Sequence, residues 1–197
     1  MNNQLRQCQL LQLNIAKEVK RICKKHNIQY FLNAGTLLGA IRHNGFIPWD
    51  DDLDIGMLRS EYEKFIKIAP KELDEKYFLQ TWDSDPYYAM PFAKIRMNGT
   101  KYVEYNSRNV KLHEGIYIDI FPYDLLLNKS GYDYIAKTQH IKYFLCITLK
   151  MLSSLYSYKK IHKKFYATIT KYNHECTKNV VTFGGASSFE KETLKYE

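Results

Sequence analysis

A chain of 197 residues has room for one compact domain with a short appendage, and its apolar content of 45% is enough for a packed core. Twenty-nine Lys and Arg residues against 21 Asp and Glu residues give a net charge of +8. These values exclude a disordered or low-complexity chain and favour partners that carry negative charge. The four cysteines include no C-x-x-C pair, which argues against a zinc module and predicts a reduced, cytoplasmic setting.

Hydrophobic periodicity and turn residues predict alternating helices and strands in the first part of the chain. In chain order, the expected elements are a helix over 5–26, a strand over 28–32, a helix from 36 to 42, a strand over 50–57 and a helix over 60–68. Thr36 is placed to cap the second helix. Ser60, with Glu63 three residues later, forms a capping-box pattern for the third helix, and Pro70 is expected to close it.

The second part of the chain begins with aromatic and β-branched runs and then returns to a helical pattern. The expected elements are strands over 77–81, 92–97, 101–105 and 115–121, followed by helices between 132 and 176. The dipeptide Asn98-Gly99 is typical of a hairpin turn. The prediction is therefore an α+β fold, with a mixed sheet flanked by helices over 1–128 and a basic helical C-terminal part over 129–197.

The whole charge excess lies in that C-terminal part. Residues 129–178 contain ten Lys and two acidic residues, a net +8, while the rest of the chain holds 19 basic and 19 acidic groups. Lys142 and Lys150 interrupt the most apolar stretch, which leaves it short of the ~18–20 residues that span a bilayer. The N-terminus also lacks the apolar stretch of a signal peptide. We expect a cytoplasmic protein whose basic part either contacts anionic membrane or polymer or is a solvated helix face.

The most informative segment is the acidic run that begins at Asp50. In an extended strand, alternate side chains share a face, so Asp50, Asp52 and Asp54 lie together while Leu53 and Ile55 point to the core. Carboxylates gathered on one face repel unless a cation offsets their charge. Oxygen ligands of this kind suit Mg²⁺ or Mn²⁺, which also bind nucleotide phosphates.

Two other interpretations of this run stay open on the residues alone. One is a solvated acidic turn, which the alternation with apolar residues disfavours. The other is an EF-hand calcium loop, because Asp50, Asp52, Asp54 and Glu61 fall at its first, third, fifth and twelfth positions. The sixth position of that loop requires glycine for a sharp turn and holds Ile55 here, which counts against the EF-hand.

Several blocks, in order, resemble the LicD family, which includes phosphocholine transferases of bacterial surface polysaccharide and is similar to the fukutin-related sugar-phosphate transferases. The matching residues are Gly35, Leu38-Gly39-Ala40, Arg42, Gly45, the run Ile47-Pro48-Trp49-Asp50-Asp51-Asp52-Leu53-Asp54, Ala93-Lys94-Ile95-Arg96 and Gly115-Ile116-Tyr117-Ile118-Asp119-Ile120-Phe121-Pro122. Members of the family continue into a further C-terminal segment, so a shortened C-terminal part is an expectation for this chain.

The resemblance implies a nucleotidyltransferase-like fold in which a turn with a small residue and a D-x-D strand hold a metal-bound nucleotide. Gly35 and Thr36 match the turn. Asp52 and Asp54 match the D-x-D pair, and Asp119 matches the third carboxylate, from a neighbouring strand. These three acids are the expected ligands of Mg²⁺ or Mn²⁺.

The implied reaction transfers phosphocholine, or a related substituted phosphoryl group, from a CDP-linked donor such as CDP-choline to a cell-surface glycan, for example lipopolysaccharide or teichoic acid. Asp119 or Asp50 would accept or orient the proton of the acceptor hydroxyl. Arg42, Lys94 and Arg96 are candidate phosphate contacts, because guanidinium and ammonium groups complement oxyanions.

Two further functions remain as alternatives. A nucleotidyltransferase in the strict sense would use the same acids and release pyrophosphate. A non-enzymatic basic module that binds anionic polymer would need no cluster of aspartates. We expect no nucleic acid as partner, since the basic excess is separate from the candidate catalytic residues.

Overall fold

The computed structural model of the chain describes residues 3–81, 83–88, 90, 92–104, 108 and 110–123. The expected domain boundary at 128 and the basic helical part over 129–197 lie outside the described residues. None of the helices described contains an apolar stretch of the length needed to cross a bilayer.

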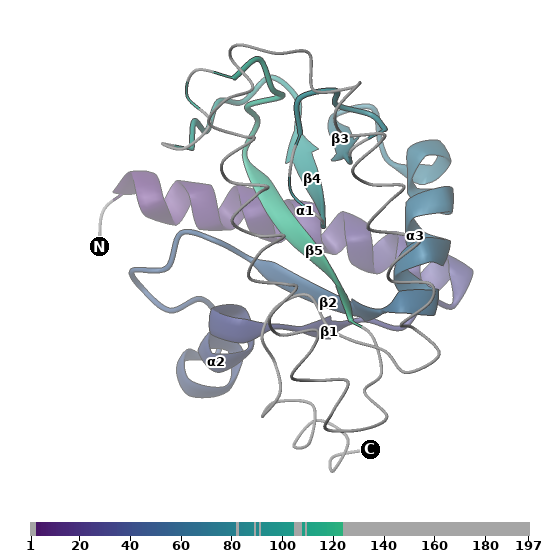
Figure 1. Cartoon of the computed structure of the whole chain (residues 1–197). Helices are drawn as coiled ribbons and strands as arrows, with labels where there is room; N and C mark the ends of the chain where they lie inside the picture. The colour runs from purple at the N-terminus through teal and green to yellow at the C-terminus, as the bar shows by residue number, and fades with distance from the viewer. Residues whose placement is uncertain are drawn as a thin grey trace, which may run out of the picture.

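The described part is a mixed α+β fold, as predicted, built on a five-stranded sheet (Figure 1). The elements are α1 (Asn3–His26), β1 (Phe31–Leu32), α2 (Ala34–His43), β2 (Asp54–Leu58), α3 (Arg59–Glu72), β3 (Tyr77–Gln80), β4 (Ala93–Met97) and β5 (Tyr117–Tyr123). The strand order is β1-β2-β5-β4-β3, in which β2 and β5 are parallel and the other neighbours are antiparallel. This order brings β2 and β5, far apart in sequence, to the centre of the sheet.

One face of the sheet is apolar and forms the core. Ile55 on β2 pairs with Ile120 on β5, which pairs with Ala93 on β4, and all three side chains are buried. Helices α1 and α3 pack against this face, and Figure 1 shows α1 crossing behind the sheet. Because side chains alternate along a strand, the residues between these positions point to the opposite face.

That opposite face carries a row of polar side chains. Asp54 on β2 pairs with Asp119 on β5, Asp119 pairs with Lys94 on β4, and Lys94 pairs with Gln80 on β3. Residues in register on adjacent strands share a face and lie close together. The sheet therefore places two acids, a cation and an amide side by side across four strands.

Helix α2 begins differently from the prediction. Its N-cap is Asn33, whose side chain accepts a hydrogen bond from the Ala34 N–H, so the prediction of Thr36 as the cap is wrong. The Thr36 hydroxyl instead accepts a hydrogen bond of 2.8 Å from the Asp54 N–H. Thr36 thus ties the first turn of α2 to the beginning of β2.

Helix α3 also differs at both ends. It begins at Arg59 directly after β2, with Leu58 at the N-cap position and no side-chain cap, so the predicted capping box at Ser60 is wrong. Pro70 lies inside the helix, which continues to Glu72. The prediction that Pro70 closes the helix is therefore wrong. The helix continues past the proline, and the Leu73 N–H donates to the Ala69 carbonyl.

The predicted strand over 101–105 does not form within its described residues, 101–104. The chain turns at Asn98 and Gly99, where Gly99 has φ 72, but β4 then pairs with β3 and β5 and makes no hairpin with the following segment. The Thr100 hydroxyl donates to the Met97 carbonyl and accepts from the Ile116 N–H, which holds this segment as a loop.

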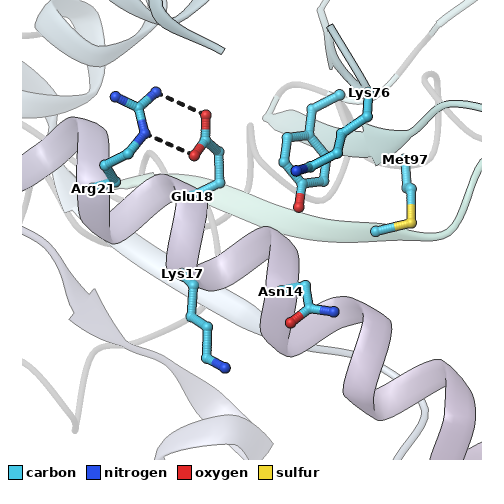
Figure 2. Close-up of a pocket in the computed structure, with 7 residues that line it drawn as sticks. Asn14, Lys17, Glu18, Arg21, Lys76 and Met97 are labelled. Atoms are coloured by element: carbon cyan, nitrogen blue, oxygen red, sulfur yellow. Dashed lines mark hydrogen bonds and ion pairs between the residues drawn. The ribbon is translucent and has the colours of Figure 1, made fainter. Parts of the chain in front are cut away.

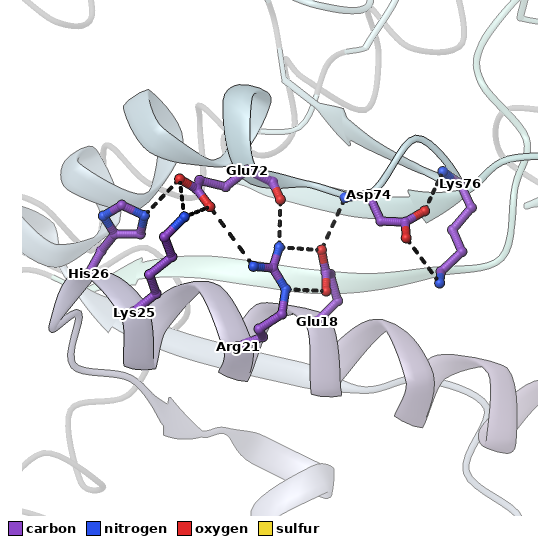
Figure 3. A network of polar contacts seen from close by, with 7 residues as sticks. All are labelled: Glu18, Arg21, Lys25, His26, Glu72, Asp74 and Lys76. Carbon is purple, nitrogen blue, oxygen red and sulfur yellow. Dashed lines mark hydrogen bonds and ion pairs between the residues drawn. The ribbon is translucent and has the colours of Figure 1, made fainter.

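Charged side chains fix α1 against the end of α3 (Figure 3). Arg21 makes two bonds of 2.8 Å to the Glu18 carboxylate and donates to the Glu72 carbonyl. The Glu72 carboxylate in turn contacts Lys25 at 2.8 Å and His26 at 3.1 Å. Exposed pairs of this kind each contribute little, so the network orients the helices more than it stabilises them.

Candidate active site

The acidic run of the sequence divides into a loop and a strand. Asp54 begins β2, whereas Asp50, Asp51 and Asp52 lie in the preceding loop, so the predicted strand starts four residues later than expected. We call residues 47–53 the acid loop. Carboxylate oxygens of Asp50, Asp51 and Asp52 lie within 4.8 Å of one another. Asp51, which the sequence did not single out, is thus part of the cluster.

Asp54 and Asp119 extend this cluster onto the sheet. They are register partners on the parallel strands β2 and β5, and the Asp119 N–H donates to the Leu53 carbonyl at 3.0 Å. Burial, Asp52 and Asp119 raise the pKa of Asp54 to about 8. Burial, followed by Asp50, Asp119 and Asp51, raises the pKa of Asp52 to about 6. Five carboxylates therefore repel one another in a partly buried place, and a cation would relieve that repulsion.

The donor set fits a hard divalent cation. The candidate ligand atoms are all carboxylate oxygens, which bind Mg²⁺ and Mn²⁺ better than they bind softer metals. The EF-hand alternative is wrong, because Ile55 lies in β2 with its side chain in the core and α2 already ends at His43. Asp52, Asp54 and Asp119 stay our predicted metal ligands, with Asp50 close by.

Lys94 is a buried ammonium group beside the acids. Its Nζ lies 2.8 Å from Asp119 Oδ1, 3.7 Å from Glu104 Oε1 and 3.4 Å from the centre of the Tyr117 ring. Burial raises the pKa of Asp119, and Lys94 lowers it. Lys94 therefore offsets the charge of Asp119, and the phosphate contact expected of this lysine stays a prediction.

Arg96 lies two residues along the same strand and is 1% exposed. Its guanidinium donates to Gln80 Oε1 at 2.5 Å, to the Gly115 carbonyl at 2.8 Å and to Glu104 Oε2 at 3.1 Å. Gln80 in turn donates to Asp85 at 2.7 Å. Through these bonds Arg96 holds Glu104 and links β4 to the residue that precedes β5. Its role as a phosphate contact stays a prediction.

The start of α2 lies against the acid loop. A Cβ atom added at Gly35 would lie 2.8 Å from Asp50 Oδ2, so only glycine allows the carboxylate to approach the first turn of the helix so closely. Thr36, next in the chain, holds the Asp54 N–H. Arg42 lies in the last turn of α2 and is exposed. The structure therefore brings Gly35 and Thr36 to the acids and places Arg42 at the other end of α2. The substrate contacts expected of these three residues stay predictions.

The contact at Gly35 gives a test. We expect Gly35→Ala to lower kcat/KM about 10–100-fold for the transfer that the family resemblance implies, because the new methyl group displaces Asp50 from the cluster. The free energy of unfolding should change by less than about 1 kcal/mol, since alanine favours the helix. Gly45→Ala is the matched control, because a Cβ atom there has no neighbour within 4 Å. Equal kinetics of the two variants would contradict the contact.

Three groups of the site could not be predicted from the motifs. Glu104, in the loop after β4, contacts both Lys94 and Arg96. The Tyr102 hydroxyl donates to Asp51 Oδ2 at 2.6 Å. Gln9 and Gln12 reach the acid loop from α1, and their only sequence signal is a three-residue spacing in phase with the apolar stripe of that helix.

A separate hollow of about 540 Å³ lies elsewhere on the described surface (Figure 2). Its lining residues come from α1, β3 and β4 and the turn before β3: Asn14, Lys17, Glu18, Arg21, Lys76, Tyr77 and Met97. Figure 2 shows Arg21 turned toward Glu18, with which it pairs. None of the clustered acids lines this hollow, so it is distinct from the candidate active site.

Comparison with known proteins identifies the family of the chain. Residues 27–152 match the family model described as "LicD/FKTN/FKRP, nucleotidyltransferase domain". The chain belongs to this family. The match covers α2, the acid loop, β2 and β5, and therefore every carboxylate of the acid cluster. It also confirms the resemblance to LicD that the sequence blocks indicated.

Curated relatives include the lipopolysaccharide cholinephosphotransferase LicD of Haemophilus influenzae, which is 38% identical over 137 residues, 69% of this chain and 50% of the relative. The human ribitol 5-phosphate transferase FKRP is 43% identical over 42 residues, 21% of this chain and 8% of the relative. The yeast mannosyltransferase regulator 4 is 28% identical over 115 residues, 54% of this chain and 9% of the relative. The chain thus spans about half the length of the LicD relative.

Proposed function

We propose that this member of the LicD family transfers phosphocholine, or a closely related substituted phosphoryl group, from a CDP-linked donor to a hydroxyl group of a cell-surface glycan. The observation that carries the proposal is the cluster of Asp50, Asp52, Asp54 and Asp119, whose mutual repulsion fits a site for a cation and a diphosphate. The similarity to a lipopolysaccharide cholinephosphotransferase supports phosphocholine as the group and a glycan as the acceptor.

In the proposed reaction, the acceptor hydroxyl oxygen forms a bond to the phosphorus of phosphocholine, and the bond from that phosphorus to the CMP oxygen breaks. CMP leaves with the bonding electron pair, and the hydroxyl proton passes to a carboxylate. Such a reaction depends on positioning and on charge neutralisation more than on covalent participation of the protein.

Each acid has a role that follows from its surroundings. Asp52, Asp54 and Asp119 would hold Mg²⁺ or Mn²⁺, which when bound neutralises charge on the diphosphate. Lys94, 2.8 Å from Asp119, offsets part of the effect of burial, which raises the pKa of this carboxylate, and so favours the charged form that a ligand needs. Asp50, next to Gly35 at the start of α2, is then the better acceptor of the hydroxyl proton. Arg42 would contact a phosphate of the donor.

The test is a donor and product assay on the full chain. We expect CMP and a modified glycan from CDP-choline with Mg²⁺ and lipopolysaccharide or teichoic acid acceptors, measured by mass spectrometry, and no product in EDTA. CDP-ethanolamine and CDP-linked polyols test the headgroup. Pyrophosphate release from nucleoside triphosphates, with no CMP from any CDP-linked donor, would favour the nucleotidyltransferase alternative and overturn the proposal.

A further inference from the structure

Two glutamines of α1 are buried where an amphipathic helix would place apolar residues. Gln9 is 0% exposed and Gln12 is 2% exposed, and they continue the buried stripe formed by Ile15, Val19 and Ile22. Two leucines nearby, Leu10 and Leu13, are instead exposed. An amide buried without partners costs free energy, so this arrangement requires partners for the two side chains.

The partners are main-chain carbonyls of the acid loop. Gln9 Nε2 donates to the Ile47 carbonyl at 3.2 Å and to the Asp50 carbonyl at 2.8 Å. Its Oε1 accepts from Arg6 at 3.1 Å. Gln12 Nε2 donates to the Asp51 carbonyl at 2.8 Å. All three bonds to the loop cross about 40 residues of sequence, so they join two separate parts of the fold.

These hydrogen bonds hold the main chain of the acid loop at the residues that carry the carboxylates. The backbone places the Cβ atom of each aspartate and limits the rotamers that its carboxylate can adopt. The loop bonds act on the carbonyls of Asp50 and Asp51 themselves. The three loop carboxylates repel one another within 4.8 Å. A loop under such repulsion spreads unless its backbone is held, and the glutamine donors supply three bonds that hold it.

We propose that Gln9 and Gln12 are positioning residues for the candidate active site: by holding the carbonyls of the acid loop, they keep Asp50 and Asp52 turned toward Asp54 and Asp119. The inference rests on the proposed function. It extends the functional unit to a helix that precedes the matched family domain, which begins at residue 27. Neither glutamine touches the reacting groups.

The test compares Gln9→Met, Gln12→Met and the control Gln7→Met in the full chain. Methionine has a similar length and stays apolar, but it cannot donate a hydrogen bond to a carbonyl; Gln7 is exposed on the same helix. Binding of Mn²⁺ alone is measured by electron paramagnetic resonance. We expect the dissociation constant for Mn²⁺ to rise about 10–100-fold in the first two variants, as for other residues that orient metal ligands, and to be unchanged in the control.

A second readout separates positioning from folding. We expect faster hydrogen exchange in peptides that cover the acid loop of the metal-free Gln9→Met protein, with unchanged protection of β4 and β5. The Mg²⁺ concentration that gives half-maximal transfer should rise in parallel with the dissociation constant for Mn²⁺. A purely structural role would lower the active fraction of the protein and leave that concentration unchanged.

The outcomes are distinguishable. If the wild-type protein binds Mn²⁺ and Gln9→Met and Gln12→Met bind it equally well, the inference is wrong and the proposed function stands. If the wild-type protein binds no Mn²⁺ and transfers nothing, the proposed function itself fails. If neither variant folds, the glutamines are structural, and the positioning role is overturned.

Discussion

Replacing Asp54 by Asn is expected to abolish transfer and, at the same time, to make the metal-free protein more stable at pH 8. The side chain is the central member of the acid cluster, and its loss removes a predicted metal ligand, so we expect a decrease in kcat of at least about 10³-fold. The same change removes a partly buried negative charge that Asp52 and Asp119 repel. Residues of functional sites commonly lower the stability of the folded protein.

The pH dependence of the free energy of unfolding follows from the raised pKa of Asp54. Because the pKa of Asp54 is raised to about 8 in the folded protein, the folded state holds this proton more tightly than the unfolded state. The metal-free wild-type protein should therefore lose stability as the pH rises from about 4 to 8. We expect the Asp54→Asn variant to lack this part of the loss and to be about 1–3 kcal/mol more stable at pH 8, since a tenfold change in an acid constant corresponds to about 1.4 kcal/mol.

Urea unfolding of both proteins in EDTA at pH 5 and pH 8 measures this difference, and repeating it with Mg²⁺ gives the second half of the test. Mg²⁺ should stabilise the wild-type protein and have a much smaller effect on Asp54→Asn. Asp83→Asn is the control, because Asp83 is exposed. A variant that is less stable than the wild type in EDTA at pH 8 would contradict the repulsion on which the site is built.

Apart from the strand expected over 101–105, the sequence predicted the strands of the sheet, and it pointed to the acids that the sheet brings together, because both depend on local patterns. Leu53 and Ile55 alternate with Asp52 and Asp54, and both apolar side chains are buried in the core. Ile118 and Ile120 flank Asp119 in the same way. Where one face of a strand is buried, the period of two specifies which side chains share the other face.

The supports of the site could not be predicted, because they depend on contacts between distant segments. Glu104 lies in a segment predicted as a strand, and only the folded sheet shows that it meets two buried cations. Gln9 and Gln12 are unremarkable residues in an amphipathic helix until the acid loop is placed against them.

The predictions of the two helix caps were wrong for a similar reason. Thr36 and Ser60 are good caps by local preference, but tertiary contacts override that preference. The Thr36 hydroxyl accepts from Asp54, and α3 begins directly at the end of β2. Local propensity is a weak guide wherever a side chain has a distant partner.

Replacing Lys94 by Met is expected to cause the largest loss of stability among the changes discussed here. The Lys94 side chain is 3% exposed and contacts Asp119 and Glu104, whose side chains are 12% and 23% exposed. Removing the ammonium leaves two carboxylates without this cation. We expect the free energy of unfolding at pH 7.5 to fall by about 3–5 kcal/mol, the usual result of breaking a buried ion pair on one side.

A matched control separates this effect from the loss of any lysine. Lys101 pairs with Glu114 at 3.5 Å, but its side chain is 74% exposed. Lys101→Met should therefore change the free energy of unfolding by less than about 1 kcal/mol. Urea unfolding of the two variants, side by side with the wild type, measures both. Similar losses in the two variants would show that burial of the Lys94 pair has no special role.

The carboxylates that lose their cation in Lys94→Met determine how the stability of this variant depends on pH and on a second substitution. Burial already raises the pKa of Asp119, and Lys94 lowers it more than Arg96 does. Without the lysine, protonation of Asp119 removes the unpaired charge, so the Lys94→Met variant should lose less stability at pH 5 than at pH 7.5. The double variant Lys94→Met/Asp119→Asn should regain much of the loss at pH 7.5, because it removes the same charge by mutation. Transfer should stay absent in the double variant, which retains the fold and lacks the third predicted ligand.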